Sequence, residues 1–133
     1  MLIEFRVENH RSIRDEQALT MEASLLEDAT DPRPRTVAGH DKKLLPVAAI
    51  YGANASGKTN VLAAMDFMRE SVMVSHRLWE PEEGVPFSPF AWGPKRAEPS
   101  EFVIQFLIGG VRHEYGFVAT AEQFIEEWLF AWP

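Results

Sequence analysis

The feature that most constrains this chain is the stretch GANASGKT at residues 52–59. A continuous apolar run, PVAAIY, precedes it at residues 46–51, and apolar residues at helical spacing follow it from residue 58 to about residue 76. A short apolar run of this kind is typical of a strand that is covered on both faces, as in a parallel sheet flanked by helices. Apolar residues at helical spacing predict an amphipathic helix. The sequence therefore predicts a buried strand, a tight glycine-containing loop and a helix in direct succession.

The loop itself matches G-x-x-x-x-G-K-[ST], the pattern of a phosphate-binding loop. Its glycines let consecutive backbone N–H groups point at phosphate oxygens, and the start of the helix adds its positive dipole end. We expect Lys58 to reach the β- and γ-phosphates and the Thr59 hydroxyl to bind Mg²⁺. The predicted nucleotide-binding residues are Gly52, Ala53, Asn54, Ala55, Ser56, Gly57, Lys58, Thr59 and Asn60. Tyr51, at the end of the apolar run, is interpreted as a core residue rather than a base-stacking one.

The helical segment has an apolar stripe and a polar side. The stripe is predicted to face the core, with Asp66, Arg69 and Glu70 toward the other side. The predicted core-facing residues are Val61, Met65, Met68 and Val72, broadened by Leu62 and Ala64.

Alternating residues predict antiparallel strands at both ends of the chain. Residues 2–8 place Ile3, Phe5 and Val7 on one face, and residues 18–23 suit a short strand that returns as a hairpin. Near the other end, a Gly-Gly pair at residues 109–110 separates two alternating runs, which predicts a two-residue hairpin between residues 101 and 118.

The register of this second hairpin follows from counting outward from its turn. The predicted partners are Ile108 with Val111, Phe106 with His113, Ile104 with Tyr115, and Phe102 with Phe117. His113 is interpreted as a packed or edge histidine, because no second histidine or carboxylate lies at metal spacing. The tail at residues 123–133 suits either a helix or a further strand.

Two segments are predicted to lack regular structure. Residues 24–43 are charged and contain prolines, which indicates a surface excursion. Residues 80–100 contain five prolines, which exclude a long helix, and we expect Phe87, Phe90 and Trp92 to attach this segment to the core.

Composition narrows the classes of partner and compartment. The net charge of −7 argues against a broad nucleic-acid surface in this segment, and the absence of cysteine excludes a disulfide framework. No apolar run approaches the roughly 18 residues needed to span a bilayer, and the N-terminus lacks the pattern of a signal peptide. We therefore expect a soluble cytoplasmic protein without a membrane partner.

The stretches YGANASGKTN and FRVENHRSI carry a resemblance to a known group of proteins. The first resembles the Walker A loop of ABC-type ATPases of the SMC, RecF and OLD group, and the second resembles their N-F-[KR]-S motif, with His10 in place of the usual aromatic residue. Residues 44–69, together with residues 101–117, are similar to AAA-family ATP-binding proteins related to OLD nucleases and abortive-infection ATPases. The resemblance covers nearly the whole chain. It implies an α/β P-loop fold corresponding to the N-terminal portion of an ABC-type head.

Further expectations come from this resemblance alone. Arg11, or the backbone around Asn9 to Ser12, would lie near the base or phosphates of the nucleotide, although a solvent-exposed loop arginine remains an alternative. A longer parent protein would hydrolyse ATP through a dimerising head, coupled to nucleic-acid processing or phage defence. Partners would be ATP or ADP, Mg²⁺, and a second copy or second ATPase head, with nucleic acid bound only through the parent protein.

The same resemblance divides the chain into parts of an incomplete ATPase head. The expected parts are an N-terminal hairpin (1–23), a surface loop (24–45), a strand, loop and helix (46–76), a proline-rich connection (77–100) and antiparallel strands (101–133). No Walker B strand end and no L-S-x-G signature follow the loop, so no catalytic residue is assigned. We expect a portion of a longer ATPase that does not turn over ATP alone.

Two other classes of nucleotide-binding protein remain as alternatives. One is a non-hydrolysing nucleotide-binding module that acts through a partner chain. The other is a small P-loop kinase or GTPase, which is disfavoured because a proline-rich stretch and a Gly-Gly hairpin follow the helix in place of strand–helix units.

Overall fold

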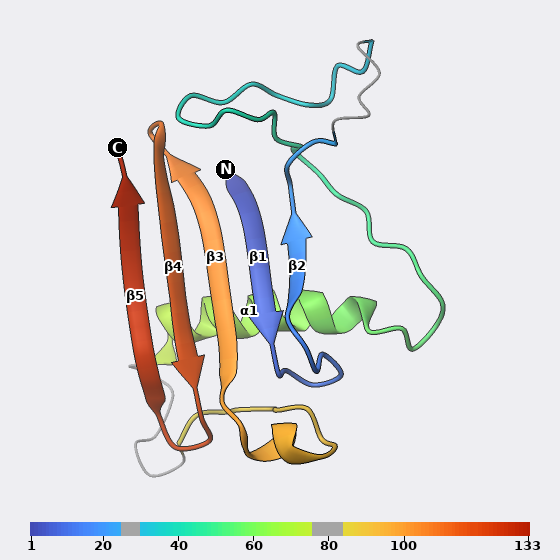
Figure 1. Ribbon diagram of the computed structural model, residues 1–133, viewed down its shortest axis with the longest axis vertical. Coiled ribbons are helices and arrows are strands. Elements are labelled where there is room, and N and C mark those ends of the chain that lie inside the picture. The colour runs from blue at the N-terminus through green and yellow to red at the C-terminus, as the bar shows by residue number, and fades with distance from the viewer. Residues whose placement is uncertain (25–29, 76–83) are drawn as a thin grey trace.

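Five strands form one sheet, and a helix crosses one of its faces (Figure 1). The computed structural model describes residues 1–24, 30–75 and 84–133. The strand order is β2-β1-β3-β4-β5, and every neighbouring pair is antiparallel. The elements are β1 (Leu2–Glu8), β2 (Gln17–Thr20), α1 (Lys58–Met73), β3 (Ser100–Ile108), β4 (Val111–Ala119) and β5 (Phe124–Trp132), with a 3₁₀ turn at Pro94–Ala97.

The two predicted hairpins are confirmed. β1 pairs with β2, and the alternating residues Ile3, Phe5 and Val7 are buried. β3 and β4 pair in the predicted register, from Ile108 opposite Val111 to Phe102 opposite Phe117. Gly109 and Gly110 have φ angles of 59° and 81°, the positive values that a tight hairpin turn requires. The ambiguous tail forms a strand, β5, which pairs with β4 along its length.

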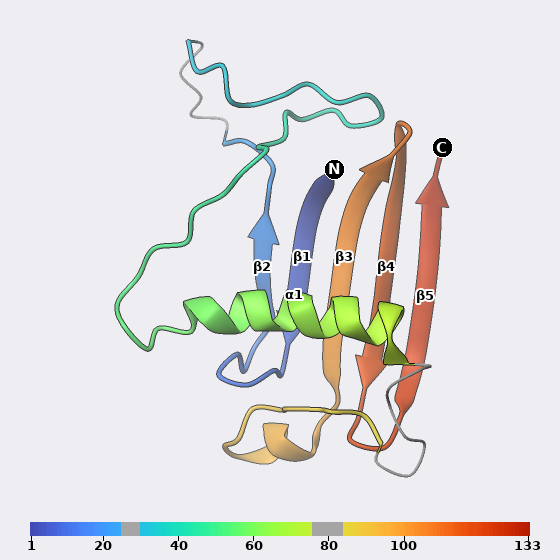
Figure 2. The ribbon, with the colours of Figure 1, turned by 180° about the vertical axis from the view of Figure 1, so that it is seen from behind.

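The main core lies between α1 and the sheet. Figure 2 shows α1 crossing in front of the strands. Phe67 of α1 packs on Phe102 of β3, and Phe102 stacks on Phe117 of β4; the ring centroids of each pair are 5.1 Å apart. Aromatic pairs at this separation add to the free energy gained by burying the rings themselves.

The predicted buried face of α1 is partly wrong. The helix buries Ala64, Phe67, Met68 and Ser71. Val72 and Leu62, which we expected to face the core, are 54% and 58% exposed. Apolar residues occupy most of the helix circumference, so the pattern alone does not select a face. The aromatic cluster on the sheet selects the face that carries Phe67.

The prediction of a buried strand at residues 46–51 is wrong. This segment is extended but forms no strand, and no backbone–backbone hydrogen bond joins it to another described residue. It runs outside the β2 edge of the sheet before it reaches α1 (Figure 2). Tyr51, expected in the core, is 89% exposed, and Val47 is 71% exposed. An apolar strand is buried only where neighbouring strands cover it, and the described residues supply none here.

The two irregular segments are attached to the sheet at particular points. In the surface excursion, Leu44 is fully buried against Ile3 and Leu107. In the proline-rich segment, Phe87 and Phe90 are partly buried, whereas Trp92, expected to attach it to the core, is 76% exposed. Residues 25–29 of the excursion and residues 76–83, including the predicted end of the helix, lie outside the described residues.

Asn9, rather than Trp92, attaches the proline-rich segment to the end of β1. Its Nδ2 donates to the backbone carbonyls of Lys95, Glu98 and Pro99, at 2.8 to 3.1 Å, and its Oδ1 accepts from the backbone N–H of Phe90 at 3.0 Å. Asn9 has no exposed surface, so these bonds are shielded from water. Among the described helices, none has the length and apolar character needed to cross a membrane.

Candidate phosphate-binding site

The glycine-containing loop leads directly into the first turn of α1. Gly57 is the N-cap residue of the helix, with φ 89°, and Ala55 has φ 62°. A non-glycine residue in this left-handed region costs roughly 1–2 kcal/mol, so the loop holds a strained backbone at Ala55. The first turn of α1 contains no acidic residue. Its free backbone N–H groups are therefore not neutralised by a carboxylate of the same turn. The helix start is therefore suited to an anion.

Lys58 lies over the loop that precedes it. Its Nζ donates to the backbone carbonyls of Gly52 at 2.7 Å and Ala53 at 2.5 Å. The ammonium group is therefore held on the loop rather than extended into solvent. A compact cation beside backbone N–H groups is the arrangement that binds the β- and γ-phosphates of a nucleotide. Thr59 follows in the first turn of α1 and is exposed, so its hydroxyl is accessible to a hydrated Mg²⁺.

The loop after β1 contacts the phosphate loop through Ser12. The Nδ2 of Asn60 donates to Ser12 Oγ at 2.5 Å, joining two residues 48 positions apart in sequence. Backbone bonds fix the loop that carries Ser12: His10 and Ile13 exchange two bonds of 2.8 Å, and the Arg11 N–H donates to the Ser88 carbonyl at 2.7 Å.

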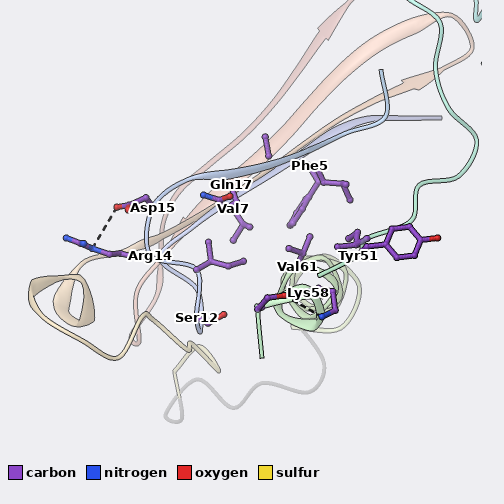
Figure 3. Close-up of a pocket in the computed structure, with 15 residues that line it drawn as sticks. Phe5, Val7, Ser12, Arg14, Asp15, Gln17, Tyr51, Lys58 and Val61 are labelled. Carbon is purple, nitrogen blue, oxygen red and sulfur yellow. Dashed lines mark hydrogen bonds and ion pairs between the residues drawn. The ribbon is translucent and has the colours of Figure 1, made fainter. Parts of the chain in front are cut away.

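A cavity of about 460 Å³ connects these two loops (Figure 3). The phosphate loop contributes Ser56, Gly57 and Lys58, and the loop after β1 contributes polar side chains and the apolar Ile13. The polar residues that line the cavity on that side are Ser12, Arg14, Asp15 and Gln17. Apolar side chains of β1 and α1, including Val7 and Val61, complete the wall. The cavity therefore has a cationic end at Lys58 and a mixed polar end around Asp15.

Neither Arg11 nor Tyr51 has its side chain directed into the cavity beside Lys58. Arg11, expected near the nucleotide, does not line the cavity, whereas Ser12 beside it does. The backbone of Arg11 is left-handed, with φ 52°, and its side chain is exposed. Tyr51 lines the rim, but Figure 3 shows its ring directed away from Lys58.

The loop that carries Ser12 also contains a buried histidine, His10. His10 is 2% exposed, stacks on Phe67 at 5.7 Å and meets Phe102 edge-on at 5.2 Å. Neither ring nitrogen has a hydrogen-bond partner among the residues that the structure describes. Burial, followed by the nearby Arg11 charge, lowers the pKa of His10 to about 4. The ring is therefore neutral at pH 7 and occupies an aromatic position in the core.

The sequence showed the phosphate loop, and the resemblance placed the backbone around Ser12 near the nucleotide, but neither indicated the hydrogen bond between Ser12 and Asn60. A G-x-x-x-x-G-K-[ST] match depends on eight consecutive residues, so it is visible in the sequence. The contact between Ser12 and Asn60 depends on how β1 lies against α1, and the only sequence signal for it was the general resemblance of residues 5–13 to a motif.

Comparison with known families adds an independent observation. A family model described as "AAA domain, putative AbiEii toxin, Type IV TA system" matches residues 47–133. The match includes the phosphate loop, α1 and the strands β3 to β5. No curated protein and no solved structure matches the chain.

Proposed function

The chain belongs to the AAA domain family described as a putative AbiEii toxin of a type IV toxin–antitoxin system, and from that premise we propose that residues 52–60 bind ATP or ADP with Mg²⁺. AAA-type domains are nucleotide-binding P-loop domains, and this family match includes the predicted loop. The observation that carries the proposal is the position of Lys58, whose ammonium group lies on the loop beside the N-terminus of α1.

The cavity supports one orientation of the nucleotide. Phosphates would lie at the loop, with Lys58 on the β- and γ-phosphates and Thr59 on Mg²⁺. The nucleoside would then extend toward Asp15 and Gln17 at the other end of the cavity. Arg11 does not line the cavity, so the geometry of the cavity does not support its expected contact with the nucleotide.

The finer assignment is also a proposal. We place the chain with the OLD, RecF and SMC group, as part of a longer protein whose head hydrolyses ATP with a second head for nucleic-acid processing or phage defence. The stretches YGANASGKTN and FRVENHRSI support this assignment. A non-hydrolysing module that acts through a partner chain is the second candidate; residues 60–133 contain no Walker B strand end and no L-S-x-G signature.

The outer face of α1 supports a second copy of this chain as a partner. Leu62, Asp66, Arg69 and Met73 follow one another at intervals of four, three and four residues, and all four are exposed. They border an apolar groove of about 560 Å³. In an antiparallel pair of α1 helices related by a two-fold axis, Asp66 would lie beside Arg69 of the second copy, and Leu62 beside its Met73. This stripe is therefore complementary to itself.

Thermal unfolding with different ligands tests the nucleotide-binding proposal. ADP with Mg²⁺ should raise Tm, because a ligand at about 100 times its Kd stabilises the folded state by about 2.7 kcal/mol. Adenosine at the same concentration should leave Tm unchanged, since it lacks the phosphates that the loop holds. An equal rise with adenosine and ADP would contradict phosphate binding by this loop.

A further inference from the structure

Among the described residues, the Ser12 hydroxyl has one hydrogen-bond partner, and its own hydrogen is unused. Asn60 Nδ2 donates to Ser12 Oγ, so the serine oxygen acts as an acceptor in that bond. The hydroxyl hydrogen remains able to donate, since a serine hydroxyl is both a donor and an acceptor. Because the oxygen position is set by Asn60, the remaining donor direction is restricted rather than free.

This hydroxyl lies next to the phosphate loop. A Cβ built on Gly57 would stand 3.1 Å from Ser12 Oγ, so the two segments approach to within a close contact at this point. Ser12, Gly57 and Lys58 all line the same cavity. In Figure 3 the Ser12 oxygen is directed toward the segment that carries Lys58. An anion held at the N–H groups of the loop would therefore lie beside a hydroxyl donor from the loop after β1.

Ser12 also lies at the boundary between the phosphate-loop end of the cavity and its mixed polar end. On one side are the phosphate-loop residues, and on the other are Arg14, Asp15 and Gln17. In the orientation of the nucleotide given above, the phosphate nearest the nucleoside occupies this junction. The backbone bonds of His10 and Arg11 hold the Ser12 loop in place, which lowers the entropic cost of using its hydroxyl for binding.

We propose that Ser12 donates a hydrogen bond to the α-phosphate of the bound nucleotide, and that Asn60 is a positioning residue that acts through Ser12. This inference rests on the proposed nucleotide-binding function. It assigns a binding role to a residue outside the phosphate loop. It also changes the expected role of Asn60 from direct contact with the nucleotide to orientation of a hydroxyl.

The test is Mg-ADP binding by wild type and variants, combined with ³¹P NMR of the bound nucleotide. Ser12→Ala should weaken ADP binding roughly 3- to 10-fold, the range for one neutral hydrogen bond. Asn60→Ala should weaken it by a similar factor. The double variant should be no weaker than the weaker single variant, because both changes remove the same contact. Ser12→Thr, which keeps the hydroxyl, should bind within about twofold of wild type.

The phosphorus spectrum separates ligand contact from a structural role. Ser12→Ala should move the α-phosphorus resonance of bound ADP and leave the β-phosphorus resonance in place. A loss of loop structure would disturb both resonances. Ser88→Ala is the matched control, since its exposed hydroxyl has no described partner and its backbone carbonyl still accepts from Arg11.

Failure of this inference is distinguishable from failure of the proposed function. If Ser12→Ala binds ADP like Ser88→Ala with an unchanged α-phosphorus resonance, while Lys58→Ala loses binding, the Ser12 inference is wrong and the phosphate site stands. Additive losses in the double variant would also overturn the role given to Asn60. If wild type itself does not bind ADP, both proposals fail together.

Discussion

The two sides of α1 differ in how completely they are covered. The inner side carries Phe67 and Met68 and packs on the aromatic rings of β3 and β4. The outer side and the extended segment 46–51 carry apolar residues of similar size, yet Leu62, Met73 and Tyr51 are more than half exposed. Both regions have the composition of a core, but the other described residues cover only the inner side of α1. Apolar composition therefore predicts a need for burial, and topology decides where that need is met.

The largest expected difference between the covered core and the exposed segment 46–51 is in the free energy of unfolding when one aromatic ring is removed from each. Phe102→Ala should lower the free energy of unfolding by about 3–5 kcal/mol, because it leaves a cavity among buried rings. Tyr51→Ala should change it by less than about 0.5 kcal/mol, since the ring is exposed. Chemical denaturation of both variants checks the pair. Equal losses would mean that residues 46–51 are packed in the folded protein.

The next effect concerns the outer face of α1. Asp66→Arg and Arg69→Asp should each weaken self-association, because each places like charges together across the proposed two-fold axis. The double exchange should restore it, since the pair is again complementary. Sedimentation velocity over a range of concentrations measures the result. Val47→Glu serves as the control outside the helix, and a chain that stays monomeric in every form would refute the proposed α1 interface.

A smaller effect is expected from His10 in the covered core. Its pKa is about 4 in the folded chain and about 6.5 when unfolded, so the unfolded state binds more protons between these values. The contribution of His10 to stability is therefore complete above pH 6.5 and is lost as the pH falls toward 4.

His10→Phe should remove this dependence on pH. It should also raise stability at pH 7 by about 1 kcal/mol, because it eliminates two buried ring nitrogens that have no partner in the described part of the chain. Urea unfolding of the variant and wild type at pH 7 and pH 5 gives both quantities. A wider gap in stability between the two proteins at pH 5 than at pH 7 is expected, and an unchanged gap would contradict a buried neutral histidine.

The parts of the fold that were predicted correctly depend on neighbouring residues. Gly109 and Gly110 determine a two-residue turn, and the alternation on either side then sets the whole register of β3 and β4. The same holds for β1, where every second residue is buried. These predictions needed no information about distant segments.

The parts that were wrong depend on distant segments. Residues 46–51 have the composition of a buried strand, but burial requires strands beside them, which no local pattern reveals. The inner face of α1 was misassigned at Val72 because the position of Phe102 and Phe117 selects the face. For the site, the phosphate loop was visible in consecutive residues, whereas the contact of Ser12 with Asn60 joins segments 48 residues apart.

The central claim is that this loop holds a nucleotide by its phosphates, and calorimetric titration of wild type and Lys58→Ala with Mg-ATP tests it most directly. Removal of the Lys58 ammonium should weaken binding 10- to 100-fold, which is about 1.4 kcal/mol per factor of ten. Lys42→Ala is the matched control, because that lysine pairs with Glu22 away from the loop and should bind like wild type. Equal binding by wild type and Lys58→Ala, or no binding by wild type, would contradict the account.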